Sequence, residues 1–338
     1  MRIGLFLGAG FSAPFDLPVM DNFLSFAENS KRISEDDKRF IDELVLDARR
    51  ANSFLQSRPT NLEDILSFAV MGDRLGLVTD TNSERAQRIK EILQKIYSQV
   101  SNVDSYWEKY QSFKSFLGFD LRQFEHDLSI ITTNYDLNIE SALYYCGRRA
   151  DPRFQLAQIT DGQYHVRGNL YTADGIPLFK LHGSVNWYEN IEKEDSFWVE
   201  DRVVQVRGDD LAPATSLPLI CSDKYECNYI PIIIPPTFLK PEFAGPMRKI
   251  WSSAAKALEE AQLVAFVGYS FPPTDTEMRY FLARSFVNNA RLRKIVIIDK
   301  QAKKIVERLK EDASGFGSHF KEFLEPLEYD WTTSQLKL

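Results

Sequence analysis

The sequence predicts an α/β fold: a Rossmann-like, mostly parallel sheet with an inserted helical block and a small proline-rich section. Short apolar runs of strand length alternate with stretches of helical periodicity, a pattern typical of buried parallel strands. The first run, residues 3–7, leads into a G-x-G-x-x-A turn at Gly8, Gly10 and Ala13. The chain has 338 residues, 44% of them hydrophobic, which is enough to bury a large core.

The glycine turn is the first candidate binding element. Glycine has no Cβ to keep a phosphate group away from backbone amides, and amides at a helix start favour negative charge. The motif is short, so a plain tight turn without a ligand is the alternative interpretation.

Helical patterns fill the region after this turn, with apolar side chains recurring at helical spacing. Ser34 is a suitable helix cap, and T-N-L-E at residues 60–63 is a capping box. We expect a helical insertion, residues 31–127, between two strands of the sheet. Helices in and before it are expected over residues 19–27, 34–50, 60–70, 83–99 and 103–117.

Strand and helix patterns alternate again after the insertion. Strands are expected over residues 128–133, 163–171, 176–182, 263–267 and 294–299, and a hairpin over residues 196–207. Helices are expected over residues 137–145 and 246–261, from a cap at Asp275 to about residue 287, and after residue 299. We expect a single domain, residues 1–338, with its core in residues 1–30, 128–188 and 262–310 and a small section at residues 189–245.

Composition excludes several classes of protein. The net charge of -7 provides no basic field, so direct binding to nucleic acid is not expected. Three cysteines are not a disulfide framework and fit a reducing, cytoplasmic location. Cys221 and Cys227 have no second pair, so we expect no zinc module and no metal. No apolar run approaches the ~20 residues of a membrane helix, so no membrane partner is expected.

Polar or glycine-rich segments follow the apolar strands at the points where they end. Because the carboxyl ends of parallel strands share one edge of a sheet, these segments should meet in one ligand site. They are residues 8–12, 134–136, 182–184 and 268–270, and Asp299.

A dehydrogenase of the ordinary dinucleotide type does not fit this pattern. Such an enzyme needs a second strand and an acidic residue ~20 residues after its glycines, to hold the adenosine ribose. Residues 28–31 are instead a polar stretch flanked by helices. Hydride transfer is therefore disfavoured.

Together the segments resemble the sirtuin family, in particular its divergent bacterial sirtuin-like branch. The resemblance is carried in the family's order by G-A-G-F-S at residues 8–12, L-P at 17–18, T-T-N-Y-D at 132–136, K-L-H-G-S at 180–184, G-Y-S at 268–270 and I-I-D at 297–299. It implies NAD+ as substrate, bound across the strand ends, with its nicotinamide–ribose bond cleaved.

The resemblance also implies roles for single residues. Asn134 would position the attacking water or the ribose hydroxyls, Asp136 would hold the nicotinamide amide, and His182 would act as a base. Gly8, Ala9, Gly10 and Ser12 would cradle the phosphates. Gly268 would also bind the dinucleotide, with Ser270 and Asp299 on its adenosine side. The structural alternatives are that Asn134 and Asp136 cap the following helix and that His182 is a hydrogen-bonded turn residue.

Departures from the protein-deacylating sirtuins favour water as the acceptor. The segment after the glycine turn keeps only Leu17-Pro18, the zinc-binding cysteines are missing, and Tyr135 replaces the usual isoleucine. The resemblance thus implies NAD+ hydrolysis in bacterial anti-phage defence. Regulation would come from homo-oligomer assembly or from a separate regulatory protein, such as a nucleic-acid-translocating ATPase. The alternatives are an NAD+-dependent deacylase or ADP-ribosyltransferase, and a non-catalytic subunit that senses NAD+ or ADP-ribose.

Overall fold

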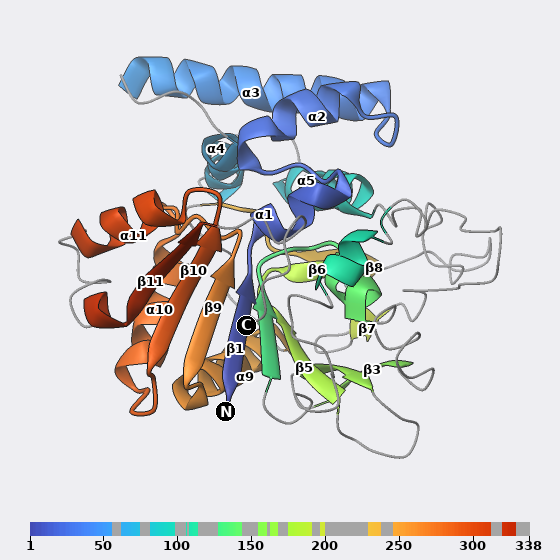
Figure 1. Cartoon of the computed structure of the whole chain (residues 1–338). Helices are drawn as coiled ribbons and strands as arrows, with labels where there is room; N and C mark the ends of the chain where they lie inside the picture. Colours follow the sequence, from blue (N-terminus) through green and yellow to red (C-terminus); the bar gives the residue numbers. More distant parts are fainter. Residues whose placement is uncertain are drawn as a thin grey trace.

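An eight-stranded sheet forms the centre of the computed structural model, and six neighbouring strands of it run parallel, which confirms the predicted α/β class (Figure 1). The strand order is β11 (Leu324–Glu328), β10 (Lys294–Asp299), β9 (Leu263–Val267), β1 (Ile3–Leu7), β2 (Leu128–Thr132), β5 (Gly175–Lys180), β4 (Gln163–Arg167) and β3 (Gln155–Thr160). The structure describes residues 1–55, 62–74, 82–98, 106, 108–113, 128–143, 155–160, 163–167, 175–190, 197–199, 229–237, 246–311 and 320–328.

The first strand lies in the middle of the sheet. Ile3 of β1 pairs with Leu128 of β2 on one side and with Leu263 of β9 on the other. Every residue of β1 is buried, which explains its continuous apolar sequence. The chain builds outward from β1 through β2 and β5, then returns to β9 and builds the other way. The order therefore reverses between β1 and β9, where ligands of such sheets bind.

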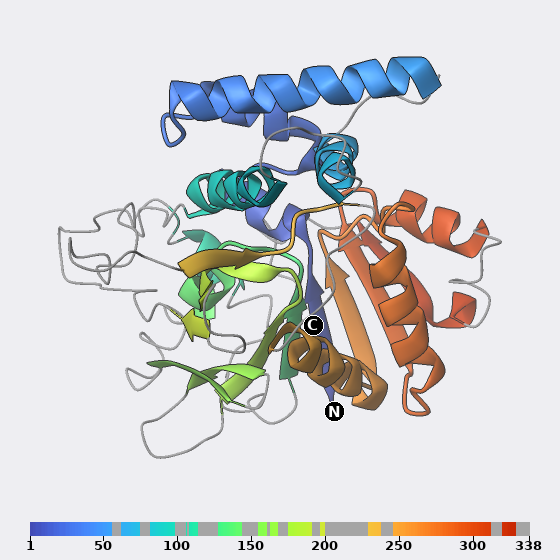
Figure 2. The same cartoon turned by 180° about the vertical axis from the view of Figure 1, so that it is seen from behind.

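Two helices cover one face of the sheet, α9 (Pro246–Glu260) and α10 (Thr276–Val287), and they pack against each other (Figure 2). Asp275 caps α10 as predicted, because its carboxylate accepts the backbone N–H of Met278 at 3.3 Å. A further helix, α11 (Ala302–Glu311), follows β10 and packs on β11.

The helices between β1 and β2 lie over the carboxyl ends of the strands, with α3 outermost in both views (Figures 1 and 2). They are α2 (Phe23–Asn29), α3 (Glu35–Leu55), α4 (Leu62–Arg74) and α5 (Asn82–Tyr97), and we call them the helical block. Ser34 caps α3 as predicted, in a reciprocal arrangement with Asp37. The expected helix at 103–117 is helical over 108–113, whereas residues 60 and 61 of the expected capping box lie outside the described residues.

A second, antiparallel sheet stands beside the first, in the order β7 (Phe197–Val199), β6 (Gly183–Asn190) and β8 (Tyr229–Ile233). The other half of the hairpin expected at 196–207 lies outside the described residues, and β7 pairs with β6. The α5 helix packs on β8, and Gln94 Nε2 donates to the Val185 carbonyl at 2.8 Å. Within the described ranges, no helix is both long and apolar enough to cross a membrane.

Candidate functional site

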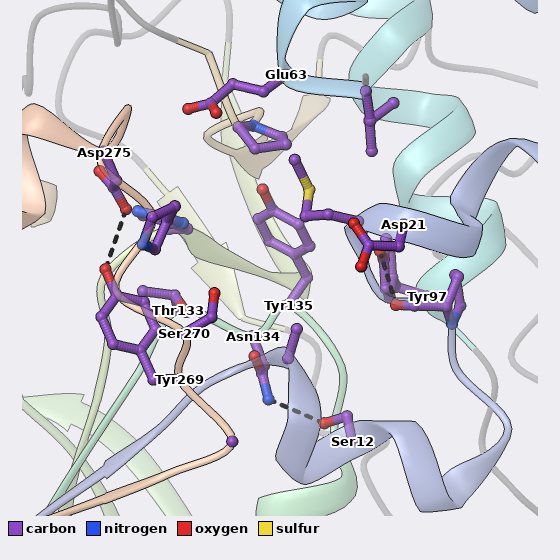
Figure 3. Close-up of a pocket in the computed structure, with 18 of the residues that line it drawn as sticks. Ser12, Asp21, Glu63, Tyr97, Thr133, Asn134, Tyr135, Tyr269, Ser270 and Asp275 are labelled. Atoms are coloured by element: carbon purple, nitrogen blue, oxygen red, sulfur yellow. Dashed lines mark hydrogen bonds between the residues drawn. The ribbon is translucent and has the colours of Figure 1, made fainter. Parts of the chain in front are cut away.

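A cavity of about 350 Å³ opens at the carboxyl ends of β1, β2, β5 and β9 (Figure 3). Its floor comes from the segments that follow these strands, and its outer wall comes from the helical block and the segment before it. The residues of this wall include Asp21, Glu63 and Tyr97. A volume near the lower end of the roughly 300–1,000 Å³ typical of ligand pockets suits part of a nucleotide. We call this cavity the strand-end pocket.

The turns after β1 and β9 touch each other beneath this pocket. The backbone N–H groups of Gly8 and Gly10 donate to the carbonyls of Val267 and Gly268, both at 2.9 Å. A Cβ on Gly8 would lie 2.5 Å from the Gly268 oxygen, and Gly268 itself has a φ of +62°. The glycines thus meet a packing requirement, and the two amides are already bonded within the protein. A phosphate-binding role for Gly8 and Gly10 stays a prediction.

The Asn134 side chain ties the segment after β2 to the turn after β1. Its Nδ2 group donates to the Ser12 hydroxyl at 2.9 Å (Figure 3). The same group also donates to the Gly8 carbonyl at 2.9 Å. The backbone N–H of Asn134 donates to Thr132 Oγ1, whose hydroxyl in turn donates to the Leu7 carbonyl. Asn134 is buried, so these bonds fix its position at the pocket edge.

His182 lies between two aromatic rings just after β5. Its ring centroid is 6.3 Å from those of both Tyr135 and Trp251, and only 6% of the residue is exposed. Trp251 is held by the bond from its indole N–H to the Leu181 carbonyl at 2.8 Å, and the His182 carbonyl accepts the N–H of Ile234. His182 also lines the strand-end pocket.

Tyr135 contributes its ring to the pocket and its hydroxyl to the scaffold. The hydroxyl donates to the Ile234 carbonyl at 2.7 Å. Burial raises the pKa of Tyr135 well above its ordinary value of 10.0, and the nearby Tyr97 and Asp275 raise it further. The group therefore stays protonated and acts as a donor at any physiological pH.

Asp136 combines a structural bond with a place in the pocket. Its Oδ1 accepts a hydrogen bond from the backbone N–H of Asn138 at 2.9 Å. Residues 138–143 are helical, so this bond is the capping arrangement expected before that helix. The residue also lines the strand-end pocket and is 1% exposed. The two roles are compatible, since one carboxylate can accept several hydrogen bonds.

A lysine to which the sequence assigned no role lies below this segment. Lys180, the last residue of β5, is 0% exposed and pairs with the equally buried Glu140 at 2.9 Å. Its ammonium also donates to the backbone carbonyls of Tyr135 and Asp136. Burial raises the pKa of Glu140, and the charge of Lys180 opposes that rise.

Most of the predicted site residues come together at this pocket. Ala9, Ser12, Asn134, Asp136, His182, Gly268 and Ser270 line it, and Gly8 and Gly10 form the turn against which it is built. Asp299 is not among the lining residues, and its Oδ1 accepts the N–H of Gln301 at 2.8 Å. Its predicted contact with the adenosine side stays a prediction.

Sequence reasoning identified none of the residues that the helical block contributes to the wall. Tyr97 donates to the Pro18 carbonyl at 3.3 Å, and the hydroxyl of Thr274, another lining residue, donates to the Glu63 carboxylate. Burial raises the pKa of Tyr97, with a further contribution from Asp136. No spacing in the sequence relates these helices to the strand ends, because their contacts depend on how the helical block packs.

Carboxylates dominate the charge of the side chains that line the pocket. Asp21, Glu63, Asp136 and Asp275 line it, and the described lining residues include no lysine or arginine. Where these carboxylates line it, the pocket favours a neutral or cationic part of a ligand over an anionic one. In the part of the chain that the structure describes, no three metal-ligating side chains converge, and Cys221 and Cys227 lie outside that part.

Comparisons with known proteins place these observations in context. The sequence profile described as "SIR2-like domain" matches residues 128–316. No protein of curated function matches the chain. Solved structures similar to it include a Sir2 homologue mutant with ADP-ribose (12% identity, 98% of this chain and 87% of that chain covered, TM-score 0.45). Another similar structure is a Sir2 homologue with NAD (11% identity, 98% of this chain and 85% of that chain covered, TM-score 0.42). A third is a Sir2 protein with acetylated peptide (13% identity, 98% of this chain and 89% of that chain covered, TM-score 0.36). At these identities and TM-scores, the structural likenesses support no conclusion about function.

Proposed function

Because the chain belongs to the SIR2-like domain family, whose profile matches more than half of it, we propose that it binds NAD+ in the strand-end pocket and hydrolyses the nicotinamide–ribose bond. The products would be nicotinamide and ADP-ribose. The observation that supports this most is that Asn134, Asp136 and His182, from segments far apart in the chain, line one pocket at the reversal of strand order.

The reaction needs few groups from the protein. The C1′–N bond breaks and its electron pair goes to the ring nitrogen, which leaves a positively charged, oxocarbenium-like ribose. Water then forms the new C1′–O bond and loses one proton. In our proposal His182 accepts that proton, Asn134 orients the water, and Asp136 accepts hydrogen bonds from the nicotinamide amide.

The acidic wall fits the charge that this reaction involves. The pyridinium ring of NAD+ and the ribose after bond cleavage both carry positive charge, and the carboxylates of Asp136, Glu63 and Asp21 lie around the same cavity. Carboxylates placed where positive charge develops lower the barrier to its formation. Aromatic rings of Tyr97 and Tyr135 in the same wall favour a flat cationic ring.

We also propose, from the sirtuin-like resemblance of the motifs, that the activity depletes NAD+ in bacterial anti-phage defence. Assembly of several copies or a separate regulatory protein would then hold the enzyme in check. A protein that consumes a central metabolite requires such control. Control by assembly is tested by measuring the particle mass of the protein in its active and in its inactive form.

The test is direct. Purified protein is incubated with NAD+, and nicotinamide and ADP-ribose are resolved by chromatography. Alanine at His182 or at Asn134 should lower product release at least about 100-fold, the size of effect expected for a general base or an orienting group. His165→Ala, on β4 opposite Pro177, is the matched control and should leave release unchanged.

Three outcomes would contradict the proposal. Unchanged release in both pocket variants would remove the site assignment. Release that requires an added acylated peptide or another macromolecule would instead identify a deacylase or an ADP-ribosyltransferase. Tight binding of NAD+ without turnover under any condition would identify a sensor.

A further inference from the structure

One buried lysine connects the two loops that carry the proposed catalytic residues. Lys180 ends β5, two residues before His182, and its side chain reaches to the segment after β2 that carries Asn134 and Asp136. A fully buried ammonium is costly unless several oxygens surround it. Here three do so: Glu140 Oε1 at 2.9 Å, the Tyr135 carbonyl at 3.3 Å and the Asp136 carbonyl.

The bonds to the two carbonyls bear on the site directly. The Tyr135 carbonyl also accepts from the Val185 N–H at 3.0 Å and from the Ser184 hydroxyl at 3.3 Å. Only Lys180, among the described donors, reaches the Asp136 carbonyl. The peptide units on either side of Asp136 therefore take their orientation from the segment that bears His182.

We propose that Lys180 is a positioning residue that sets the place of Asn134 and Asp136 relative to His182, with Glu140 as its buried counter-charge. Its catalytic consequence rests on the proposed NAD+ hydrolysis, whereas its effect on the segment after β2 does not. A lysine that only stabilised the fold could be replaced together with Glu140 without loss of activity, since well-packed apolar residues substitute for buried ion pairs. A positioning lysine could not.

Paired substitutions separate these two roles. Lys180→Met leaves the Glu140 carboxylate buried without its counter-charge and lowers the melting temperature. The double variant K180M/E140M removes both charges at similar volume and recovers most of that loss. In the double variant kcat should still be about 100-fold below that of the native protein, the size of effect of a displaced catalytic group. The KM for NAD+ should rise by a smaller factor than kcat falls, because only Asp136 of the displaced residues is proposed to bind the substrate.

Hydrogen exchange provides the second measurement and needs no substrate. The amides of Asn134 and Asn138 are bonded to Thr132 Oγ1 and Asp136 Oδ1. In K180M/E140M, a peptide covering residues 132–140 should exchange at least about tenfold faster, because the segment opens locally more often. Lys294→Met is the control, since Lys294 is a strand lysine paired with Glu325 at 2.5 Å on the edge pair β10–β11. It should change neither exchange in this peptide nor kcat.

The outcomes are decisive in either direction. A double variant in which melting temperature and kcat recover together would overturn the inference, and so would unchanged exchange in residues 132–140. If the native protein releases no nicotinamide, the proposed hydrolysis fails, and the exchange rates alone decide whether Lys180 holds the segment.

Discussion

Asn134, which we propose orients the attacking water, is held to the turn after β1 by its amide nitrogen. Its Nδ2 group has two hydrogens, and the Gly8 carbonyl and the Ser12 hydroxyl accept them. The carbonyl oxygen Oδ1 is then the atom of this side chain that can face a bound molecule. This oxygen can accept a hydrogen bond from the attacking water, whose lone pair is then free to point at C1′ of the ribose.

Gly8 is the residue at which the structure predicts the sharpest effect on stability. In Gly8→Ala the new Cβ would lie 2.5 Å from the Gly268 oxygen and 2.7 Å from Tyr269 Cα, both of which belong to the backbone. We expect the free energy of unfolding, measured by urea denaturation, to fall by about 1–3 kcal/mol, as for other overpacked sites.

Gly4→Ala in the same strand is the matched control. Its Cβ would meet Leu258 Cδ2 at 3.4 Å, an ordinary contact, so the change should cost less than about 1 kcal/mol. Equal losses in the two variants would contradict the packing role of Gly8. The sequence marked Gly8 as a special residue, but it could not show that the turn after β9 is the reason, because that turn lies far away in the chain.

At the scale of elements, the start of α3 predicts a dependence of stability on pH. Asp37 accepts from the Ser34 N–H and pairs with Lys95 at 2.9 Å. Burial raises the pKa of Asp37, but the bonds from Lys95 and Ser34 outweigh it, so the pKa lies below the ordinary 3.8. A carboxylate with a lowered pKa in the folded state stabilises above the unfolded value and loses that effect as the pH falls through the folded value.

Asp37→Asn should therefore lower the free energy of unfolding by about 1 kcal/mol at pH 7, because it removes the ion pair and weakens the cap. The gap between variant and native protein should close as the pH falls below 3.8. Asp36→Asn, at an exposed position paired with Arg39 and Arg88, is the control and should cost less than about 0.5 kcal/mol. Urea unfolding at several pH values measures the free energy of unfolding of both variants. A difference between Asp37→Asn and the native protein that grew on acidification would contradict the lowered pKa of Asp37.

Elements with two agreeing signals could be predicted from the sequence. The β9 strand combines a continuous apolar run with a glycine stop, and α10 combines helical periodicity with the Asp275 cap. The β11 strand was missed because it reads L-E-P-L-E and has exposed glutamates, as an edge strand can. The β6 strand was missed because its glycine, serine and asparagines are poor strand formers, and pairing with β7 and β8 overrides that preference.

For the molecule as a whole, the strand-end pocket predicts stabilisation by ligand. ADP-ribose at about 100 times its dissociation constant should add about 2.7 kcal/mol to the free energy of unfolding, seen as a higher melting temperature. Sodium phosphate at the same concentration is the control and should have no such effect. His182→Ala should retain the rise, since its proposed role is proton transfer. No rise with either ADP-ribose or NAD+ would contradict the assignment of the pocket.

The floor of the pocket could be predicted at this scale, and its wall could not. Sequence patterns locate strand ends, and parallel strands bring those ends to one edge. The contribution of Glu63 and Tyr97 depends on the side on which the helical block closes over the sheet, and no local pattern records that. The Lys180–Glu140 pair was missed for the same reason, since its partners lie on separate elements.

The central position of β1 has a consequence for how the protein is made. Ile3 is synthesised well before its partners Leu128 and Leu263, which lie much further along the chain. At roughly 5–20 residues per second, tens of seconds separate the synthesis of β1 from that of β9. During that time the apolar β1 segment lacks its β9 partner, and the turn at Gly268 has not been synthesised. A nascent chain therefore has no complete pocket until the segment after β9 has been synthesised.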